Sequence, residues 1–355
     1  MSPFFSIVVP CCDVEPYVSE CIDSVASQDF ADWEFVAVAE ESKDSTEGIL
    51  GERAAKDPRI RVFTGPRTGS CSVSRNVGTA MARGEYVVFL DGDDTLAAGS
   101  LGRIAAMIAE RPGADMYPCA IRVVDGATGR ETELRDNYPK DAPREMTGAE
   151  ATILAMRDPS NPPCPMLQMT VFRREFLVER RLECIPSLRR QDSEFSPRAL
   201  YFARRVVPLH EPFYLYRIRP NAIGTSARVP GHFHGDWAVI IRSLFAFHAA
   251  VSRESGFDRR VAERWASVWI PWVFYFWFEP GNVRSIPRPR RVETLEALFS
   301  DGFGGFRALL RYASRPKRIA GRWVEWFVRR PALRGMVEVL FSAYFALARG
   351  GGRAS

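Results

Sequence analysis

The stretch Tyr86-Val-Val-Phe-Leu-Asp-Gly-Asp-Asp94 decides the fold, because it joins a short apolar run directly to three carboxylates. A continuous apolar run of this length is typical of a strand buried on both faces in a parallel sheet. Ligands of open parallel sheets bind outside the carboxyl ends of the strands, where Asp91, Asp93 and Asp94 would lie. The stretch therefore predicts an α/β domain with a polar site at this edge of its sheet.

The three carboxylates need partners, because an unpaired charge at the end of a buried strand is costly. A hard divalent cation with oxygen ligands would neutralise them and could hold a diphosphate. The alternative is a solvated acidic turn that caps the following helix. The four residues from Asp91 to Asp94 do not by themselves decide between the two.

Strand and helix patterns alternate on both sides of this stretch. Apolar runs predict strands over Phe5–Val9, Trp33–Ala39, Ile60–Thr64 and Tyr86–Leu90. One-sided apolar spacing predicts helices around Val18, Ile22 and Val25, and over Ser45–Lys56, Ser72–Arg83 and Ser100–Glu110. This alternation indicates a mostly parallel sheet with flanking helices.

The pattern is less regular beyond Val124. A loop or hairpin is expected over Gly126–Arg144 and a turn over Asn161–Pro165, with helices over Ala149–Arg157 and Arg190–Ala203 and strands over Met169–Arg173 and Pro212–Arg217. From about Phe233 onward, the chain is expected to form helices separated by Gly and Pro breaks.

Composition and charge limit the class of protein. The 355 residues are 46% hydrophobic and 26% charged, as in ordinary folded domains, and contain no apolar run long enough to span a membrane. Seven cysteines without a C-x-x-C pair, and no secretory signal, predict a reduced cytoplasmic chain. Residues 281–355 hold 14 Arg and one Lys against five acids, so a net charge of +10 lies on this tail of a chain whose total is +5. The basic tail suggests an anionic partner for that region alone.

The order and spacing of motifs resemble those of family 2 glycosyltransferases. The motifs are Ser6-Ile-Val-Val-Pro10, Val14-Glu-Pro-Tyr-Val18, Cys21-Ile-Asp-Ser-Val25 with Gln28, Asp57-Pro-Arg-Ile-Arg-Val62, Ser72-Val-Ser-Arg-Asn-Val-Gly78 and Ala82-Arg-Gly-Glu-Tyr-Val-Val-Phe-Leu-Asp-Gly-Asp-Asp94. The similarity weakens after Val124 and returns at Gln191-Asp-Ser-Glu-Phe195 and Tyr214-Leu-Tyr-Arg217.

This resemblance implies a GT-A fold, which is Rossmann-like with a mostly parallel central sheet and flanking helices. The GT-A domain is expected over residues 1–230, with a donor half at about 1–125 and an acceptor half at about 126–230. Residues 231–355 are expected to form a separate α-helical region rich in aromatic residues and Arg. The implied activity is that of a hexosyltransferase, usually with inversion at the anomeric carbon, within cell-surface polysaccharide or glycolipid synthesis.

The resemblance also implies roles for individual residues. Asp91 and Asp93 match the D-x-D positions that hold the divalent cation, Mg²⁺ or Mn²⁺, and the ribose. Asp192 lies where the family places its general base, although Gln191 replaces the usual Glu. The expected donor-binding residues are Pro10, Asp13, Glu40, Arg75, Asn76 and Asp91. The plainer alternatives are a surface helix acid for Asp192 and a salt bridge to the acidic turn for Arg75.

Two donor-facing segments depart from the family pattern. Pro10-Cys-Cys-Asp13 replaces P-x-Y-N, and Ala39-Glu-Glu-Ser-Lys-Asp44 replaces D-D-G-S-x-D, so that Glu41 occupies a glycine position that can require positive φ. Thr68-Gly69-Ser70 also replaces an Asn-Gly-Gly approach. Three hypotheses stay open: a UDP-sugar transferase, a transferase that uses another nucleotide, and a catalytically impaired family member that acts as a nucleotide- or partner-binding subunit.

The aromatic, arginine-rich tail suggests contact with a membrane. Trp265, Trp269, Trp272, Phe274, Phe276, Trp277 and Phe278 crowd one stretch, and Trp323, Trp326 and Phe327 lie among Arg315, Lys317, Arg318, Arg322, Arg329 and Arg330. Such segments can lie on an anionic surface, which would place the enzyme on the cytoplasmic face near a glycan or lipid-linked acceptor. The alternative is that the aromatic residues pack into a helical subdomain. The tail resembles no nucleic-acid-binding module, so no nucleic acid is expected as a partner.

Overall fold

The computed structural model describes residues 2–157, 166–219, 234–278 and 303–330, together with positions 287, 289, 293, 296, 298 and 299. The chain divides into two compact units. The first comprises Met1–Ala155 and Pro163–Ala222, and the second comprises Met156–Pro162 and Ile223–Ser355. The turn expected over residues 161–165 lies outside the described residues.

A six-stranded sheet forms the centre of the first unit, in the order β3-β2-β1-β4-β9-β6. Its strands are β1 (Phe5–Cys11), β2 (Trp33–Glu40), β3 (Ile60–Gly65), β4 (Tyr86–Phe89), β6 (Met116–Pro118) and β9 (Thr170–Arg173). The first four are parallel, whereas β9 runs antiparallel to both β4 and β6. The strand prediction is confirmed, with β1 continuing through Pro10 to Cys11 instead of ending before it.

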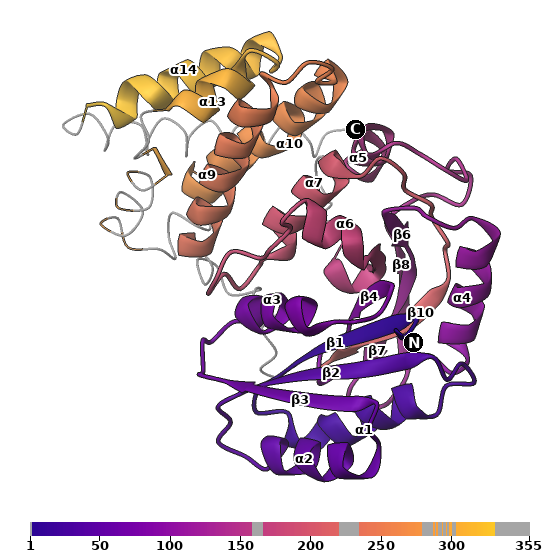
Figure 1. The fold of residues 1–355 in the computed structure, drawn as a ribbon. Helices are drawn as coiled ribbons and strands as arrows, with labels where there is room; N and C mark the ends of the chain where they lie inside the picture. Colours follow the sequence, from indigo (N-terminus) through magenta and orange to yellow (C-terminus); the bar gives the residue numbers. More distant parts are fainter. Residues whose placement is uncertain are drawn as a thin grey trace. The chain divides into compact units, whose positions relative to one another are not determined.

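Helices cover both faces of this sheet (Figure 1). On one face, Ile7 and Val9 pack into a core with α1 (Glu15–Ala26), α2 (Thr46–Lys56) and α4 (Ser100–Glu110). On the other face, Val8 packs into a second core with residues of α5 (Gly148–Ala155), α6 (Arg174–Glu179) and α7 (Asp192–Phe202). The helix α3 (Cys71–Met81) also lies on this second face, where a Cβ on Gly78 would collide with the Val8 side chain. The alternation of β1 side chains between two cores explains why Ile7, Val8 and Val9 are all apolar.

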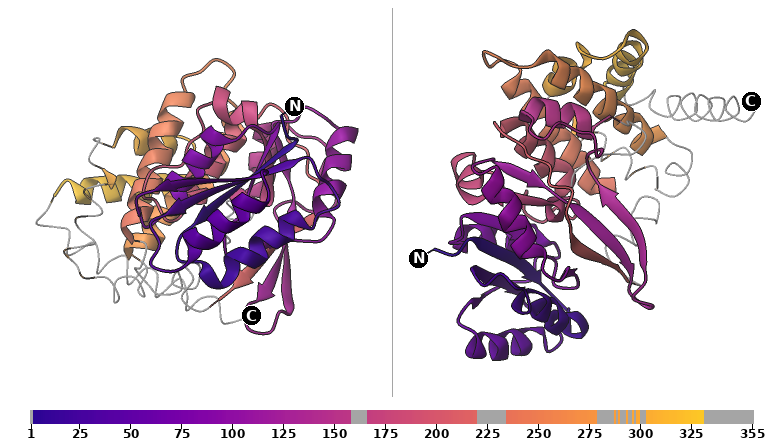
Figure 2. Two further views of the ribbon diagram at one scale, coloured as in Figure 1. Left: turned by 60° about the horizontal axis from the view of Figure 1, so that its bottom comes forward. Right: turned by 90° about the vertical axis from the view of Figure 1, so that its right-hand side faces the viewer.

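A second, four-stranded sheet has the order β5-β10-β7-β8 and was not predicted. Its strands are β5 (Thr95–Leu96), β7 (Ala120–Asp125), β8 (Glu131–Asp136) and β10 (Pro212–Ile218). A loop or hairpin was expected over Gly126–Arg144; the β7–β8 hairpin begins earlier, at Ala120, and ends at Asp136, and β10 runs beside it (Figure 2). Because β10 also pairs with β5, directly after the acidic turn, it brings a distant segment of the chain to that turn.

The segment before α7 folds through a short 3₁₀ helix, η1 (Leu167–Met169), then β9 and α6. The helix predicted over Arg190–Ala203 begins at Asp192 and ends at Phe202. Its first turn carries both Asp192 and Glu194. Carboxylates at a helix N-terminus are favoured by the helix dipole, which helps to explain where α7 begins.

The second unit contains α9 (His234–Val251), α10 (Arg259–Phe278), α13 (Gly304–Leu310) and α14 (Arg315–Val328). Trp265 and Trp269 on α10 are fully buried and stack with ring centroids 4.8 Å apart, while Trp272 packs edge-on against Trp237. These three tryptophans of α10 belong to a packed core, so their assignment to a membrane interface was wrong. The side chains of Phe274, Phe276, Trp277, Phe278 and Phe327 lie outside the described residues. Throughout the part of the chain that the structure describes, no helix combines the length and apolar character needed to cross a bilayer.

Candidate active site

The acidic turn, residues Asp91 to Asp94, leaves the carboxyl end of β4 beside the end of β1. The backbone N–H of Leu90 donates to Val8 O (3.0 Å), and Asp94 N–H closes the turn on Asp91 O (3.0 Å). A Cβ on Gly92 would lie 3.2 Å from Pro10 O and from Cys11 Sγ, so glycine allows the close approach. The turn therefore lies where the topology predicts a ligand site.

Asp91 is held by partners from two other elements. Its Oδ1 accepts from Arg75 Nη2 on α3 (2.5 Å), and its Oδ2 accepts from Gln168 Nε2 on η1 (2.7 Å). The Arg75 side chain is 2% exposed, so a buried guanidinium fixes this carboxylate in place. The salt bridge considered for Arg75 is therefore present, whereas Gln168 carried no signal in the sequence.

Asp93 and Asp94 are bound by residues of β10 and its extension. Arg219 Nε donates to Asp93 Oδ2 (2.6 Å), and Arg217 Nε donates to the Asp93 carbonyl oxygen (3.0 Å). Asp94 Oδ2 accepts from the Tyr214 hydroxyl (2.5 Å), and its Oδ1 accepts from Arg217 N–H (2.7 Å). Burial, followed by the neighbouring carboxylates, raises the pKa of Asp93 and of Asp94.

The sequence assigned no site role to Tyr214, Arg217 or Arg219. The only signal was the motif Tyr214-Leu-Tyr-Arg217, which was attributed to the family without a function. The Tyr214 hydroxyl also accepts from the backbone N–H of Asp91 (3.1 Å), so it links both ends of the turn. These three side chains show that β10 is part of the site.

Asp192 is positioned by a loop that is bound to α3. Leu188 O accepts from the hydroxyls of Ser70 (2.6 Å) and Ser72 (2.5 Å). Asn76 exchanges two 2.8 Å hydrogen bonds with the backbone of Cys184, so its amide holds the loop that precedes Asp192. In the donor-binding role expected for it, Asn76 would therefore act through this loop.

The start of α7 is linked to the acidic turn through Arg75, which also donates to Asp91. In the amide orientation that satisfies its neighbours, Gln191 accepts from Arg75 and donates to the carbonyl oxygens of Leu188 and Arg189. Asp192 is half-buried; burial raises its pKa, while Arg190 and Arg75 oppose that shift. A carboxylate with a raised pKa accepts a proton more readily at neutral pH, as a general base must.

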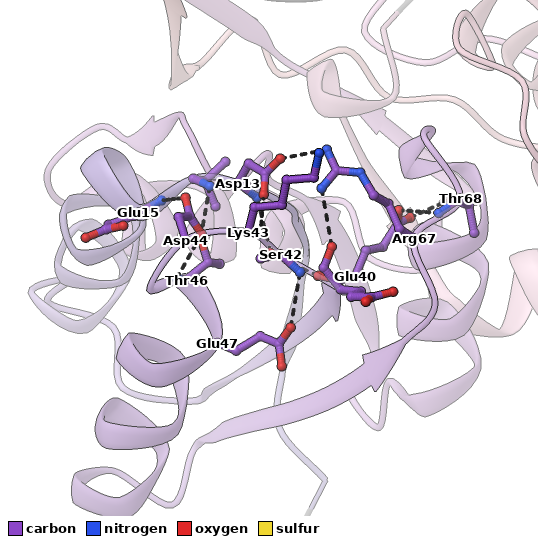
Figure 3. A network of polar contacts seen from close by, with 12 residues as sticks. Asp13, Glu15, Glu40, Ser42, Lys43, Asp44, Thr46, Glu47, Arg67 and Thr68 are labelled. Carbon is purple, nitrogen blue, oxygen red and sulfur yellow. Dashed lines mark hydrogen bonds and ion pairs between the residues drawn. The ribbon is translucent and has the colours of Figure 1, made fainter.

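Asp13 and Glu40, which were both expected to bind the donor, lie in a separate polar network (Figure 3). We call it the donor-facing wall after that expectation. Asp13 adopts φ 50°, and its carboxylate accepts from Lys43 N–H (2.8 Å) and Arg67 Nη2 (2.6 Å). The hydrogen bond from Arg67 is the main cause that lowers the pKa of Asp13 to about 2. Arg67 was not identified from the sequence.

Glu40 is buried and uses both carboxylate oxygens within the chain. One oxygen accepts from Thr68 N–H (2.8 Å), and the other accepts from the hydroxyls of Thr68 (2.7 Å) and Ser74 (2.8 Å). Arg75, which was expected beside Asp13 and Glu40, pairs instead with Asp91. Glu41 is not among the described residues with positive φ, so the strain expected there is absent.

Residues 6–180 match the family model for glycosyl transferase family 2. The uncharacterized glycosyltransferase EpsJ of Bacillus subtilis is 32% identical over 226 residues, which cover 63% of each chain. The minor teichoic acid biosynthesis protein GgaB of B. subtilis is 32% identical over 137 residues, 38% of this chain and 15% of GgaB. The match thus spans less than two thirds of either relative.

Among solved structures, S. aureus TarS 1-349 in complex with UDP matches with a TM-score of 0.70. The match covers 99% of this chain and 93% of that chain at 19% sequence identity. Identity this low shows the fold alone. The expected fold class is confirmed, with a central sheet, flanking helices and C-terminal helices in one chain.

The acidic turn has the side chains that a cation arriving with a diphosphate would need. Among the described residues, no group of three His, Cys, Asp or Glu side chains could hold a metal ion alone. Mg²⁺ and similar ions are commonly held by one or two carboxylates together with phosphate oxygens and water. Asp93, which is partly exposed, and Asp91 supply such a pair at the carboxyl end of β4.

Proposed function

We propose that this protein is a glycosyltransferase that moves a hexosyl group from a nucleotide-sugar donor to an acceptor hydroxyl, with inversion and with a divalent cation. The observation that supports the proposal is that the Arg75 side chain links the acidic turn to the start of α7. Arg75 holds Asp91 on one side and donates to Gln191, the neighbour of Asp192, on the other. One buried arginine thereby connects the donor-holding carboxylates to the candidate base.

In the proposed reaction, Asp192 accepts the proton of the acceptor hydroxyl as its oxygen bonds to the anomeric carbon. The bond from that carbon to the diphosphate breaks, and the nucleoside diphosphate leaves with the electron pair. A cation held by Asp91 and Asp93 would supply the positive charge that stabilises the leaving group. No covalent enzyme intermediate is needed, and direct displacement inverts the anomeric configuration.

Within this proposal, residues 1–125 bind the donor through Pro10, Asp13, Glu40, Arg75, Asn76 and Asp91, while residues 126–230 shape the acceptor side. A UDP-sugar is the proposed donor, because the fold matches a TarS structure that contains UDP. The changed donor-facing wall favours testing other nucleotides as well.

Thermal unfolding with UDP, GDP, CDP or dTDP, each with and without Mn²⁺, tests the donor site. A ligand at about 100 times its Kd stabilises the folded state by about 2.7 kcal/mol. We expect one nucleotide to stabilise the chain more strongly with Mn²⁺ than without it. Stabilisation by a nucleotide without any donor turnover would favour the alternative of an impaired, nucleotide-binding subunit.

We also propose that the acceptor is a glycan or lipid-linked glycan of a cell-surface polysaccharide, because the relative GgaB is named a minor teichoic acid biosynthesis protein. The helix α14 supports contact with an anionic membrane at the cytoplasmic face. Its Ile319, Trp323 and Trp326 are 50%, 53% and 39% exposed, whereas the tryptophans of α10 are buried. The exposed aromatic residues lie among arginines, which anionic lipid attracts.

Liposome co-sedimentation tests this narrower membrane proposal. The double variant Trp323→Ala/Trp326→Ala should pellet less than wild type with anionic vesicles at low salt. Neutral vesicles serve as the control for purely apolar adsorption. Equal pelleting of the variant and wild type with anionic vesicles would remove α14 from the proposal.

A further inference from the structure

Arg219 forms a salt bridge with Asp93, the carboxylate of the acidic turn that is proposed to bind a cation. It follows the last residue of β10, and its Nε lies 2.6 Å from Asp93 Oδ2. Its guanidinium also lies 5.2 Å from the centroid of the Tyr17 ring. Asp93 is the carboxylate that a diphosphate-bound cation would use, so Arg219 now occupies one of the oxygens which that cation needs.

The two arginines beside Asp93 differ in how firmly they are held. Arg217 donates through its backbone to Asp94 and through its side chain to Asp93 O, and it pairs with Glu20 at 2.6 Å. Arg219 has Asp93 as its salt-bridge partner, and its side chain is 25% exposed. Because the Arg219 side chain reaches solvent and that of Arg75 does not, separating Arg219 from Asp93 costs less than separating Arg75 from Asp91.

Asp91 provides the opposite case within the same turn. Its arginine, Arg75, is 2% exposed, and breaking a buried pair is costly. A cation that approaches the turn therefore encounters two salt bridges. The Arg75–Asp91 salt bridge is fixed, whereas the Arg219–Asp93 salt bridge can be exchanged.

We propose that Arg219 is an exchangeable counter-charge for Asp93, an inference that rests on the proposed cation-dependent donor binding. Without donor, the guanidinium neutralises Asp93. When a cation with a diphosphate binds, the cation takes Asp93 and the freed guanidinium turns to the diphosphate. A guanidinium suits this second role because its planar fork can bind phosphate oxygens through two parallel hydrogen bonds.

This proposal predicts opposite changes in two affinities when Arg219 is neutralised. In Arg219→Gln, Mn²⁺ no longer competes with a guanidinium for Asp93, so Mn²⁺ alone should bind about tenfold more tightly, equivalent to about 1.4 kcal/mol. At saturating Mn²⁺, inorganic pyrophosphate should bind about fivefold or more weakly, because a phosphate-binding group is lost. A merely structural role for Arg219 would weaken both.

The test uses the full chain and measures free Mn²⁺ by electron paramagnetic resonance, without nucleotide. The matched control is Arg122→Gln, which removes the same charge from a 40% exposed arginine paired with Glu131 on the β7–β8 hairpin. The control should bind Mn²⁺ and pyrophosphate as wild type does. Arg219→Lys keeps the charge without the fork and should retain the wild-type Mn²⁺ affinity while losing part of the pyrophosphate affinity.

Unchanged or weaker Mn²⁺ binding by Arg219→Gln, or an equal gain in Arg122→Gln, would overturn the proposal. Failure of the proposed function has a different signature. In that case no nucleotide-sugar is turned over by wild type, whereas the Mn²⁺ affinities of the variants still report whether Arg219 competes for Asp93.

Discussion

The acidic turn and the donor-facing wall are both rich in carboxylates, but they obtain their partners in different ways. Asp91 is bound by Arg75, 16 positions earlier, and by Gln168, 77 positions later, while Asp94 and Asp93 are bound by Tyr214 and Arg219, 120 and 126 positions later. In the wall, Glu40 is bound by Thr68 and Ser74, and Asp13 by Lys43 and Arg67, all within the first 75 residues.

This difference indicates how the altered residues of the donor-facing wall affect the protein. In the turn, Asp91 and Asp94 have both carboxylate oxygens bound within the chain, whereas the Asp93 carboxylate is partly exposed and pairs with Arg219. In the altered wall, the buried Glu40 has both of its oxygens bound within the chain. A buried carboxylate whose oxygens accept hydrogen bonds from its own chain stabilises the fold, and it has less capacity left to bind a ligand. We therefore expect changes in the turn to reduce activity and changes in the wall to reduce stability.

The largest expected effect is in the turn, from Asp93→Ala. Transfer should be abolished, with a loss of about 10³-fold or more, because a cation contributes several kcal/mol to leaving-group stabilisation. The variant should stay folded, since the carboxylate is partly exposed and its side chain has one salt bridge. Donor turnover and thermal unfolding should be measured on the same sample. Wild-type turnover by Asp93→Ala, or by wild type in EDTA, would refute the metal role.

The next effect is expected from Asp192→Asn, which removes the candidate base. Turnover should fall about 10²–10⁴-fold, while donor affinity stays near that of wild type. Steady-state rates together with isothermal titration of the nucleotide separate the two quantities. Intact turnover with weakened donor binding would show that Asp192 belongs to the donor site instead.

In the wall, Glu40→Gln should reduce the free energy of unfolding by about 1–3 kcal/mol, because the hydrogen bonds from Thr68 and Ser74 to a charged carboxylate become weaker bonds to a neutral amide. Urea unfolding measures this change. The matched control is Glu41→Gln, since Glu41 is exposed and carries the same substitution. Equal free energies of unfolding for the two variants would show that Glu40 does not have the stabilising role that we assign to the wall.

The last effect, similar in size to that in the wall, concerns His248 in the second unit, a buried histidine that, among the described residues, has no hydrogen-bond partner at either ring nitrogen. Burial lowers the pKa of His248 from 6.5 to about 4. The unfolded chain therefore binds the proton more readily, and stability should fall as pH drops from about 6.5 toward 4, by roughly 1.4 kcal/mol per pH unit. Thermal unfolding at pH 7 and pH 5 should show this loss in wild type and a smaller one in His248→Phe. The same loss of stability in wild type and in His248→Phe would show that the pH dependence comes from other titratable groups.

The first 125 residues could be predicted well because their information is local. Apolar runs and one-sided helices alternate there, and the structure places β1, β2, β3 and β4 within a residue or two of the expected bounds. The second sheet could not be predicted, because β5 has only two residues and depends on its pairing with β10, more than 100 positions later.

Site residues that belong to sequence motifs could be predicted, but the side chains that bind them could not. Asp91, Asp93 and Asp192 were named from the sequence, but Arg219 was not, because no local pattern reveals which carboxylate a distant arginine meets. Asn76 was expected at the donor, yet its amide binds the Cys184 backbone. Side-chain type was readable from sequence, whereas the partner was decided by long-range packing.

The most direct test of the account is a donor-hydrolysis screen of the wild-type chain with UDP-, GDP-, CDP- and dTDP-sugars, in Mn²⁺ and in EDTA, beside Asp93→Ala. We predict that one nucleotide-sugar is hydrolysed in Mn²⁺, and that this release of nucleoside diphosphate is lost both in EDTA and in the variant. Equal hydrolysis by wild type and Asp93→Ala, or none by wild type with every donor, would contradict it.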